Sequence, residues 1–276
     1  MKPWLRASML LLPTTLLVIS TNLVQAEDVF VGKNVPATNQ IALDKIDHSN
    51  WDILLKKYVN NEGRVNYSAW KKSSADLQQL DQYLAHLSHS NSQGTSPEKL
   101  AFWINAYNAV TVKGILREYP TTSIRNHTAR VWGYNIWKNL KLYVSGKPVS
   151  LDQMEHQLLR KMNEPRIHFA IVCASIGCPQ LLNEAYTPEK LDEQLTTNAR
   201  HFFADQSQFR YNSSNNTFYV SSILDWFGED FGRTEKERLQ RISLWLTDDQ
   251  AKNAASTGKG TFSFLEYNWN LNDQKN

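Results

Sequence analysis

The 276-residue chain has a formal net charge of +3 and is 41% hydrophobic, with nine tryptophans, eleven tyrosines and eleven phenylalanines. This apolar bulk is enough for a core, and two cysteines are too few for a disulfide framework, so the fold must rest on that core. The nearly balanced charge gives no support for binding to nucleic acid or to an acidic membrane surface.

The N-terminus has the parts of a secretory signal peptide. Lys2 and Arg6 form a short basic region, and residues 7–19 form an apolar core. The small residues that a signal peptidase recognises follow, with Ala26 as the last residue before the expected cleavage point. We expect cleavage of residues 1–26, which leaves 250 of the 276 residues with a formal charge of +1, exported to the periplasm. The apolar core is too short for a membrane anchor, so no integral membrane span is expected after cleavage.

The following segment, residues 27–48, is polar and has no clear period, which predicts an extended arm. Helix-start signals and turns then alternate along the chain. Serine or threonine in a capping position, and proline at the first helical position, mark the starts of several helices. Helices are expected at residues 49–58, 74–87, 96–119, 151–162, 187–205, 222–231 and 234–246. Strands are expected as two hairpins, at residues 141–149 and 209–220, and as single strands at residues 167–172 and 261–267.

These elements predict a single α+β domain over residues 49–276, with a central, mostly antiparallel sheet and packed helices. The helix at residues 96–119 is apolar almost all round, so it is expected near the centre. Residues 121–139, which include Trp137, have no clear period and predict a long loop over the core. Loops of this length often carry function.

Both cysteines lie in the stretch IHFAIVCASIGCP, residues 167–179. It begins as an apolar run typical of a buried strand and breaks at Cys173 into a turn of small residues. A thiol at the end of a buried strand is a plausible nucleophile, and the backbone amides of residues 174–177 could donate hydrogen bonds to an oxyanion. Two other roles are open for Cys173, a packed small hydrophobe or half of a disulfide with Cys178.

A thiol nucleophile needs a base, and two histidines lie near Cys173 in the sequence. His168 is five residues earlier on the expected strand, and an odd offset places the two side chains on opposite faces. His156 lies on the preceding helix, which could pack against the strand, so the strand geometry favours His156. Glu155 points about 100° away from its neighbour around the helix and need not orient it.

Asn105 and Asn108 lie three residues apart on the apolar central helix. A buried amide must find hydrogen-bond partners, so these side chains either hold neighbouring backbone or line a site. The structural role is the commoner one.

Metal binding has weaker support. Asp152 and His156, at i and i+4, could share a cation, and the surrounding residues approximate the inverted zinc-peptidase pattern H-x-x-E-H with an aspartate in place of the first histidine. A third ligand is not evident, and a solvated helix face explains these residues more simply. Phosphate-loop, dinucleotide and G-x-S-x-G motifs are absent from the sequence, and no cofactor is expected.

Four blocks of sequence resemble the domain-of-unknown-function 547 family. They are FWINAYNAVTVKGIL, SLDQMEHQLLR, PRIHFAIVCASIGCPQL and LEYNWNLND. The first three fit in order from about residue 100 to residue 203, and the fourth, with LDWFGEDFG, extends the resemblance nearly to the C-terminus. Members of this family are proposed to resemble cysteine peptidases of a circularly permuted papain-like type.

The resemblance implies roles for particular side chains. Cys173 is the implied nucleophile, and because plant relatives keep the first cysteine of the turn rather than the second, it is favoured over Cys178. The base is then His156 or His168. The polar candidates for orientation or for an oxyanion are Glu155, Asn105 and Asn108.

The leading expectation is therefore an exported, thiol-dependent hydrolase that acts by acyl transfer on a peptide or amide substrate. The alternative is a non-catalytic binding domain of the cell envelope, in which Cys173 is structural or bonded to Cys178. The sequence decides neither the redox state of the cysteines nor which histidine is the base.

Overall fold

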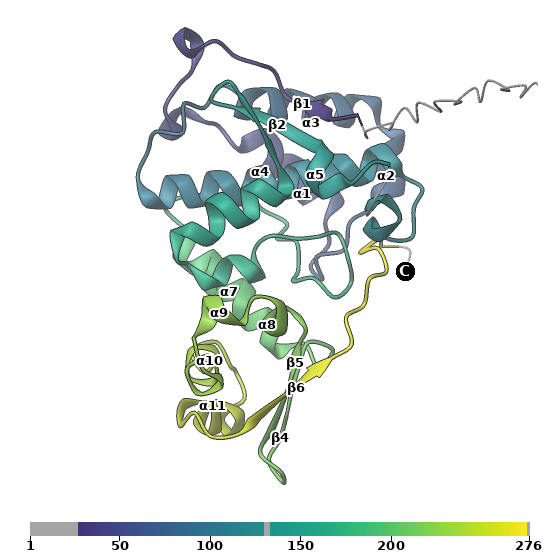
Figure 1. The fold of residues 1–276 in the computed structure, drawn as a ribbon. Coiled ribbons are helices and arrows are strands. Elements are labelled where there is room, and N and C mark those ends of the chain that lie inside the picture. The colour runs from purple at the N-terminus through teal and green to yellow at the C-terminus, as the bar shows by residue number, and fades with distance from the viewer. Residues whose placement is uncertain (1–26, 130–132, 275–276) are drawn as a thin grey trace, which may run out of the picture.

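The computed structural model describes residues 27–129 and 133–274, so the expected signal peptide lies outside the described residues. The fold belongs to the α+β class, as the sequence predicted. Figure 1 shows a group of helices around α4 (Ser96–Glu118) in one half and a small sheet with further helices beside it in the other. No helix in the described part of the chain is long and apolar enough to cross a membrane.

Helix α4 (Ser96–Glu118) runs through the larger half. Its cap is Thr95, one residue before the serine expected for this role. The Thr95 hydroxyl accepts a hydrogen bond from the Glu98 amide, and the Glu98 carboxylate accepts one from the Thr95 amide. Every side chain from Leu100 to Leu116 except that of Lys113 is buried. Three helices, of which α2 and α3 contact α4 directly, form this group with it: α1 (Ser49–Tyr58), α2 (Tyr67–Lys72) and α3 (Ser74–Leu87).

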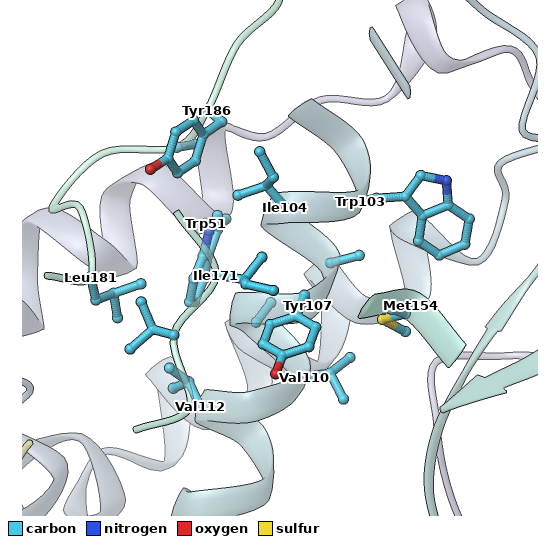
Figure 2. Close-up of a cluster of buried hydrophobic side chains, with 14 of the residues drawn as sticks. Trp51, Trp103, Ile104, Tyr107, Val110, Val112, Met154, Ile171, Leu181 and Tyr186 are labelled. Atoms are coloured by element: carbon cyan, nitrogen blue, oxygen red, sulfur yellow. The ribbon is translucent and has the colours of Figure 1, made fainter. Parts of the chain in front are cut away.

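The cysteine-bearing segment packs against the same central helix. Figure 2 shows Ile171 beside Tyr107 of α4 and Leu181 on the side of Val112, with Met154 nearby. All five side chains belong to one hydrophobic cluster. The position of the two cysteines is therefore set by the core and not by a surface loop.

The first sheet joins the start of the N-terminal arm to a hairpin. Its strands are β1 (Val29–Val31), β2 (Leu140–Val144) and β3 (Lys147–Ser150), in that order, with β1 parallel to β2 and β2 antiparallel to β3. Leu43 and Ile46 of the arm are also buried, so the arm packs on the domain.

The second sheet has the same pattern. It orders β4 (Phe209–Asn212), β5 (Thr217–Ser221) and β6 (Thr261–Leu265), with the β4–β5 hairpin antiparallel and β6 parallel to β5. The helices α10 (Glu235–Ile242) and α11 (Asp249–Ser256) share its hydrophobic cluster. The single central sheet expected from the sequence is therefore wrong. Each hairpin formed as predicted, but each pairs with a third strand that is distant in the sequence, β1 in the first sheet and β6 in the second. The local sequence pattern could not specify these partners.

The expected strand at residues 167–172 is also absent. A 3₁₀-helix, Pro165–Phe169, takes its place, and residues 170–172 are irregular. The expected helix at 151–162 is helical throughout, but it begins as α6 (Leu151–Gln153), continues as a π-helix, Met154–Leu159, and ends as a 3₁₀ turn. The other elements are α5 (Ile136–Asn139), α7 (Leu191–Ala204), α8 (Ile223–Trp226), α9 (Gly228–Phe231) and the 3₁₀ turns Ala37–Asn39, Leu43–Lys45 and Ile124–His127.

Stability should depend on the protonation of His48, which precedes α1. Its Nδ1 lies 2.7 Å from the hydroxyl of buried Tyr83, and burial together with nearby His86 lowers the pKa of His48 to about 4, although Asp47 opposes the shift. The unfolded chain, with a pKa near 6.5, therefore binds the proton first as pH falls. We expect the free energy of unfolding to fall by roughly 2–3 kcal/mol between pH 7 and pH 4 through this group, at about 1.4 kcal/mol per pKa unit.

Urea unfolding of the wild type and of His48→Asn at pH 7 and pH 5 measures this contribution. The variant should lose less stability on acidification than the wild type, and His201→Gln, on the exposed side of α7, should behave like the wild type. Equal losses in wild type and His48→Asn would contradict the assignment.

Candidate active site

Side-chain amides, and not a neighbouring strand, make hydrogen bonds to the backbone of the segment that carries the two cysteines. Asn108 of α4 donates to the carbonyl of Ala170 at 2.9 Å, and its oxygen accepts from the amide of Val172 at 2.9 Å. Asn105, one turn earlier, makes the same pair of bonds to the carbonyl and amide of Tyr186. Both asparagines are essentially inaccessible, and neither belongs to the pocket lining described below. Their observed role is to hold the backbone on both sides of the cysteines.

Helix α7 holds the same segment from another direction. The amide nitrogen of Asn198 donates to the carbonyls of Phe169 and Gln180, and Gln194 bonds the carbonyl of Ala185. A strand would have satisfied these backbone groups through a neighbouring strand, whereas here buried amides do so. This explains why an apolar run that looked like a strand forms none.

The two cysteines form a disulfide. The sulfurs of Cys173 and Cys178 are 2.09 Å apart, and the Cys173 amide donates to the Cys178 sulfur at 2.9 Å. Cys173 is half-buried and Cys178 is buried. Ala174, directly after the first cysteine, has φ of 57°, a region that costs a non-glycine residue about 1 kcal/mol or more. Backbone strain of this kind is often found next to functional groups.

Two hydroxyl groups contact the disulfide. The Tyr267 oxygen lies 3.0 Å from the Cys173 sulfur and 3.1 Å from the Cys178 sulfur, and the Ser175 hydroxyl lies 2.9 Å from the former. The two hydroxyls are 3.0 Å apart. Burial raises the pKa of Tyr267 well above its usual value, so its hydroxyl stays a hydrogen-bond donor at neutral pH.

The C-terminal segment, residues 267–273, lies along the cysteine turn. The amides of Ile176 and Gly177 donate to the carbonyls of Asn270 and Asn268, and Figure 1 shows the chain returning from β6 toward the larger half. A Cβ atom on Gly177 would lie 3.0 Å from the Asn268 amide nitrogen, a tight contact that would push the two segments slightly apart. Two of the backbone amides that the sequence offered as oxyanion donors are thus already engaged.

A pocket of about 280 Å³ opens beside the disulfide, and six of its lining residues are tryptophan, tyrosine or phenylalanine. It brings together several side chains that the sequence singled out: both cysteines, both candidate histidines, Glu155 and Trp137. Residues that the sequence analysis did not select complete it, chiefly Tyr107, Lys138, Trp226, Phe227, Tyr267 and Trp269.

His168 is buried and is held in one orientation by two partly buried side chains, Asp230 and Arg160. Its Nε2 donates to the Asp230 carboxylate at 2.7 Å, and Arg160 binds the same carboxylate through two nitrogens at 2.6 and 2.8 Å. The imidazole also stacks on Phe227 at 4.3 Å. Burial by itself raises the pKa of Asp230, but the hydrogen bonds and charges of His168 and Arg160 outweigh it and hold that pKa well below its usual range.

Asp230 is a residue that the sequence analysis missed. It lies 62 positions after His168, in the aromatic block LDWFGEDFG, and nothing in the spacing pairs the two. The sequence signal that could have pointed to Asp230 was the presence of an acidic residue within this block of the family resemblance.

His156 has a different environment. Its side chain is 42% exposed, with Nδ1 3.3 Å from Arg160 and Nε2 4.0 Å from Asp152. A strand through residue 168 would have favoured His156 over His168, but the chain forms a 3₁₀-helix there, so the two histidines are not separated on this ground. Among residues 27–129 and 133–274, no group of three or more histidine, cysteine, aspartate or glutamate side chains is placed to hold a metal ion.

Glu155 faces the pocket from the π-helix. One of its oxygens accepts a hydrogen bond from the hydroxyl of Tyr107 at 3.1 Å. Burial, and then the charge of Glu155, raise the pKa of Tyr107, so that hydroxyl also remains protonated. Single π-helical turns within helices are frequent at functional sites.

Comparison with known protein families gives a match to the central part of the chain. The family model described as "Protein of unknown function, DUF547" matches residues 91–203, the part of the chain that holds the first three blocks of the resemblance. The matched residues include α4, both cysteines and both candidate histidines. Neither the curated proteins nor the solved structures give a match to the chain.

Replacing Asn108 by alanine tests how the cysteine segment is held. The change leaves the buried Ala170 carbonyl and Val172 amide without their partner, so we expect a loss of about 2–4 kcal/mol in the free energy of unfolding. Chemical denaturation measures it. Asn253→Ala, on an exposed face of α11, is the control and should change stability by less than about 0.5 kcal/mol. Equal effects of the two substitutions would show that the amide does not hold the segment.

Proposed function

We propose that the protein is an exported, thiol-dependent hydrolase that acts on a peptide or amide, with Cys173 as nucleophile in the reduced state. One observation carries the proposal: Cys173 and His168 line the same pocket, and the imidazole of His168 is fixed by the partly buried carboxylate of Asp230. A nucleophile, a base and a group that orients the base are the elements of thiol catalysis.

In this proposal His168 is the base and Asp230 orients it. A carboxylate can only accept a hydrogen bond, so the contact with Asp230 places a proton on Nε2 and leaves Nδ1 to take the proton of a thiol. Exposed His156 lies 3.3 Å from Arg160 and 4.0 Å from Asp152, so no carboxylate holds it as closely as Asp230 holds His168. The circularly permuted papain-like arrangement remains a prediction of the family resemblance.

The reaction begins with reduction of the disulfide by a dithiol, which transfers two hydrogens to the cysteines and leaves as its own disulfide. The Cys173 sulfur, its proton passed to His168, attacks the substrate carbonyl. Tyr267, within hydrogen-bond distance of that sulfur, is placed to donate to the resulting oxyanion. The amine leaves with the proton from His168, and water then hydrolyses the thioester and restores the thiol.

A second candidate, a non-catalytic binding domain of the cell envelope, has its own support. The disulfide occupies the sulfur that catalysis needs, and the side-chain hydroxyls that contact Cys173 belong to Ser175 and Tyr267. In this case the aromatic pocket is the functional feature and the disulfide is a structural brace. Export to the periplasm, which rests on residues 1–26, is part of both proposals and would favour the oxidised form.

Cys178→Ser separates the two candidates, because it frees Cys173 without a reductant and keeps an acceptor for the Cys173 amide. We expect iodoacetamide to label Cys173 in this variant with a pH profile centred at least one unit below the ordinary thiol pKa of about 8.5. Unreduced wild type should stay unlabelled. Adding His168→Asn should move the profile back toward about 8.5, whereas His156→Asn should leave it unchanged.

Turnover completes the test. Cys178→Ser should hydrolyse members of a panel of activated esters and peptide amides without reductant, and Cys173→Ser should hydrolyse none under any condition. A labelling profile that is ordinary and indifferent to His168→Asn, with no turnover, would overturn the hydrolase and leave the binding domain.

A further inference from the structure

The pocket combines aromatic side chains with two carboxylates, those of Glu155 and Asp152, that no lysine or arginine of the described residues binds. Glu155 accepts one hydrogen bond, from Tyr107, and Asp152 has His156 at 4.0 Å. Within residues 27–129 and 133–274, neither carboxylate forms an ion pair with a lysine or arginine. Asp230, just outside the pocket, contrasts with them because Arg160 binds it through two nitrogens. Besides the two histidines, the basic side chain named in the lining is Lys138, which is exposed to solvent.

The aromatic wall has faces available to a cation. Arg125 lies over Trp269 at 5.2 Å and Arg160 over Phe227 at 5.4 Å, so these two rings already have a cationic neighbour. In the described part of the chain no lysine or arginine lies over Trp226 or Trp137. Trp226 is 46% exposed although it stacks against Trp269 at 5.7 Å. An exposed indole in a mainly apolar pocket attracts an alkylated ammonium group through its π-face.

The position of the carboxylate and the exposed indole beside the disulfide also supports a ligand site. Glu155 and Trp226 line the pocket that also contains the Cys173 sulfur, and Tyr267 contacts both that sulfur and the Trp226 ring. A ligand of small-molecule size in a cavity of about 280 Å³ would therefore touch the aromatic wall and lie close to the disulfide.

We infer that the pocket binds a ligand bearing an alkylated ammonium group, which packs against the indoles of Trp226 and Trp137 and is neutralised by Glu155 and Asp152. The identity of this ligand as the substrate rests on the proposed hydrolase function. With that function, the ammonium group belongs to the substrate and lies near its scissile amide.

The test compares choline with 3,3-dimethyl-1-butanol, which has the same shape without the charge. Titration of the oxidised wild type, followed by tryptophan fluorescence and calorimetry, requires no thiol chemistry. We expect choline to bind at least about ten-fold more tightly than the neutral alcohol, a margin consistent with a partly desolvated cation–π contact plus a carboxylate.

Variants locate the site. Trp226→Leu keeps an apolar side chain but removes the ring, and Glu155→Gln keeps the oxygen that accepts from Tyr107 but removes the charge. Each should weaken choline binding by about five-fold or more, and Glu155→Gln should leave the neutral alcohol unaffected. The matched controls are Phe264→Ala, exposed on β6, and Glu193→Gln, exposed on α7, and neither should change choline binding.

Equal affinity for the two compounds would reduce the pocket to an apolar one and overturn the inference, as would absence of binding by both. Choline binding that the pocket variants do not weaken would place the cation elsewhere and would also overturn it. Because these measurements use the oxidised protein, their failure is distinct from failure of the Cys173 labelling and turnover experiments.

Discussion

The buried side-chain amides of α4 and α7 are the constraint on which the cysteine site depends. Residues 170–186 form neither helix nor strand, yet they cross the core and would leave carbonyls and amides unpaired at a cost of about 1–3 kcal/mol for each buried group. Asn105, Asn108 and Asn198 provide the missing partners. Backbone held by side chains can follow a path that a strand cannot, and this path carries Cys173 to the wall of a pocket.

Segments on both sides of that path complete the site. The family-matched residues 91–203 contribute the disulfide, His168 and Glu155, whereas Asp230, Trp226 and Tyr267 come from the chain beyond them. The backbone pairing of residues 268–270 with the cysteine turn joins the two contributions. Orientation of the histidine, the hydroxyl at the sulfurs and most of the aromatic wall therefore depend on chain that follows the matched region.

The sequence could predict what local physics decides. The helices expected to start near residues 151 and 234 begin at capping boxes on Ser150 and Thr234, and both hairpins formed where expected, because these signals lie within a few residues of each other. The α+β class followed from them. The apolar run at residues 167–172 was misread because burial alone makes a segment apolar, whichever group satisfies its backbone. The partnership of His168 with Asp230 was out of reach, since only the packed core brings residues 62 positions apart together.

Hydrogen exchange at residues 169–178 tests most directly whether buried amides hold this segment. The Val172 amide, bonded to the Asn108 oxygen, should exchange with a protection that approaches the free energy of global unfolding, although it belongs to no helix or strand. Exchange of this amide at the rate of an open surface loop, while the amides of α4 remain protected, would contradict the account.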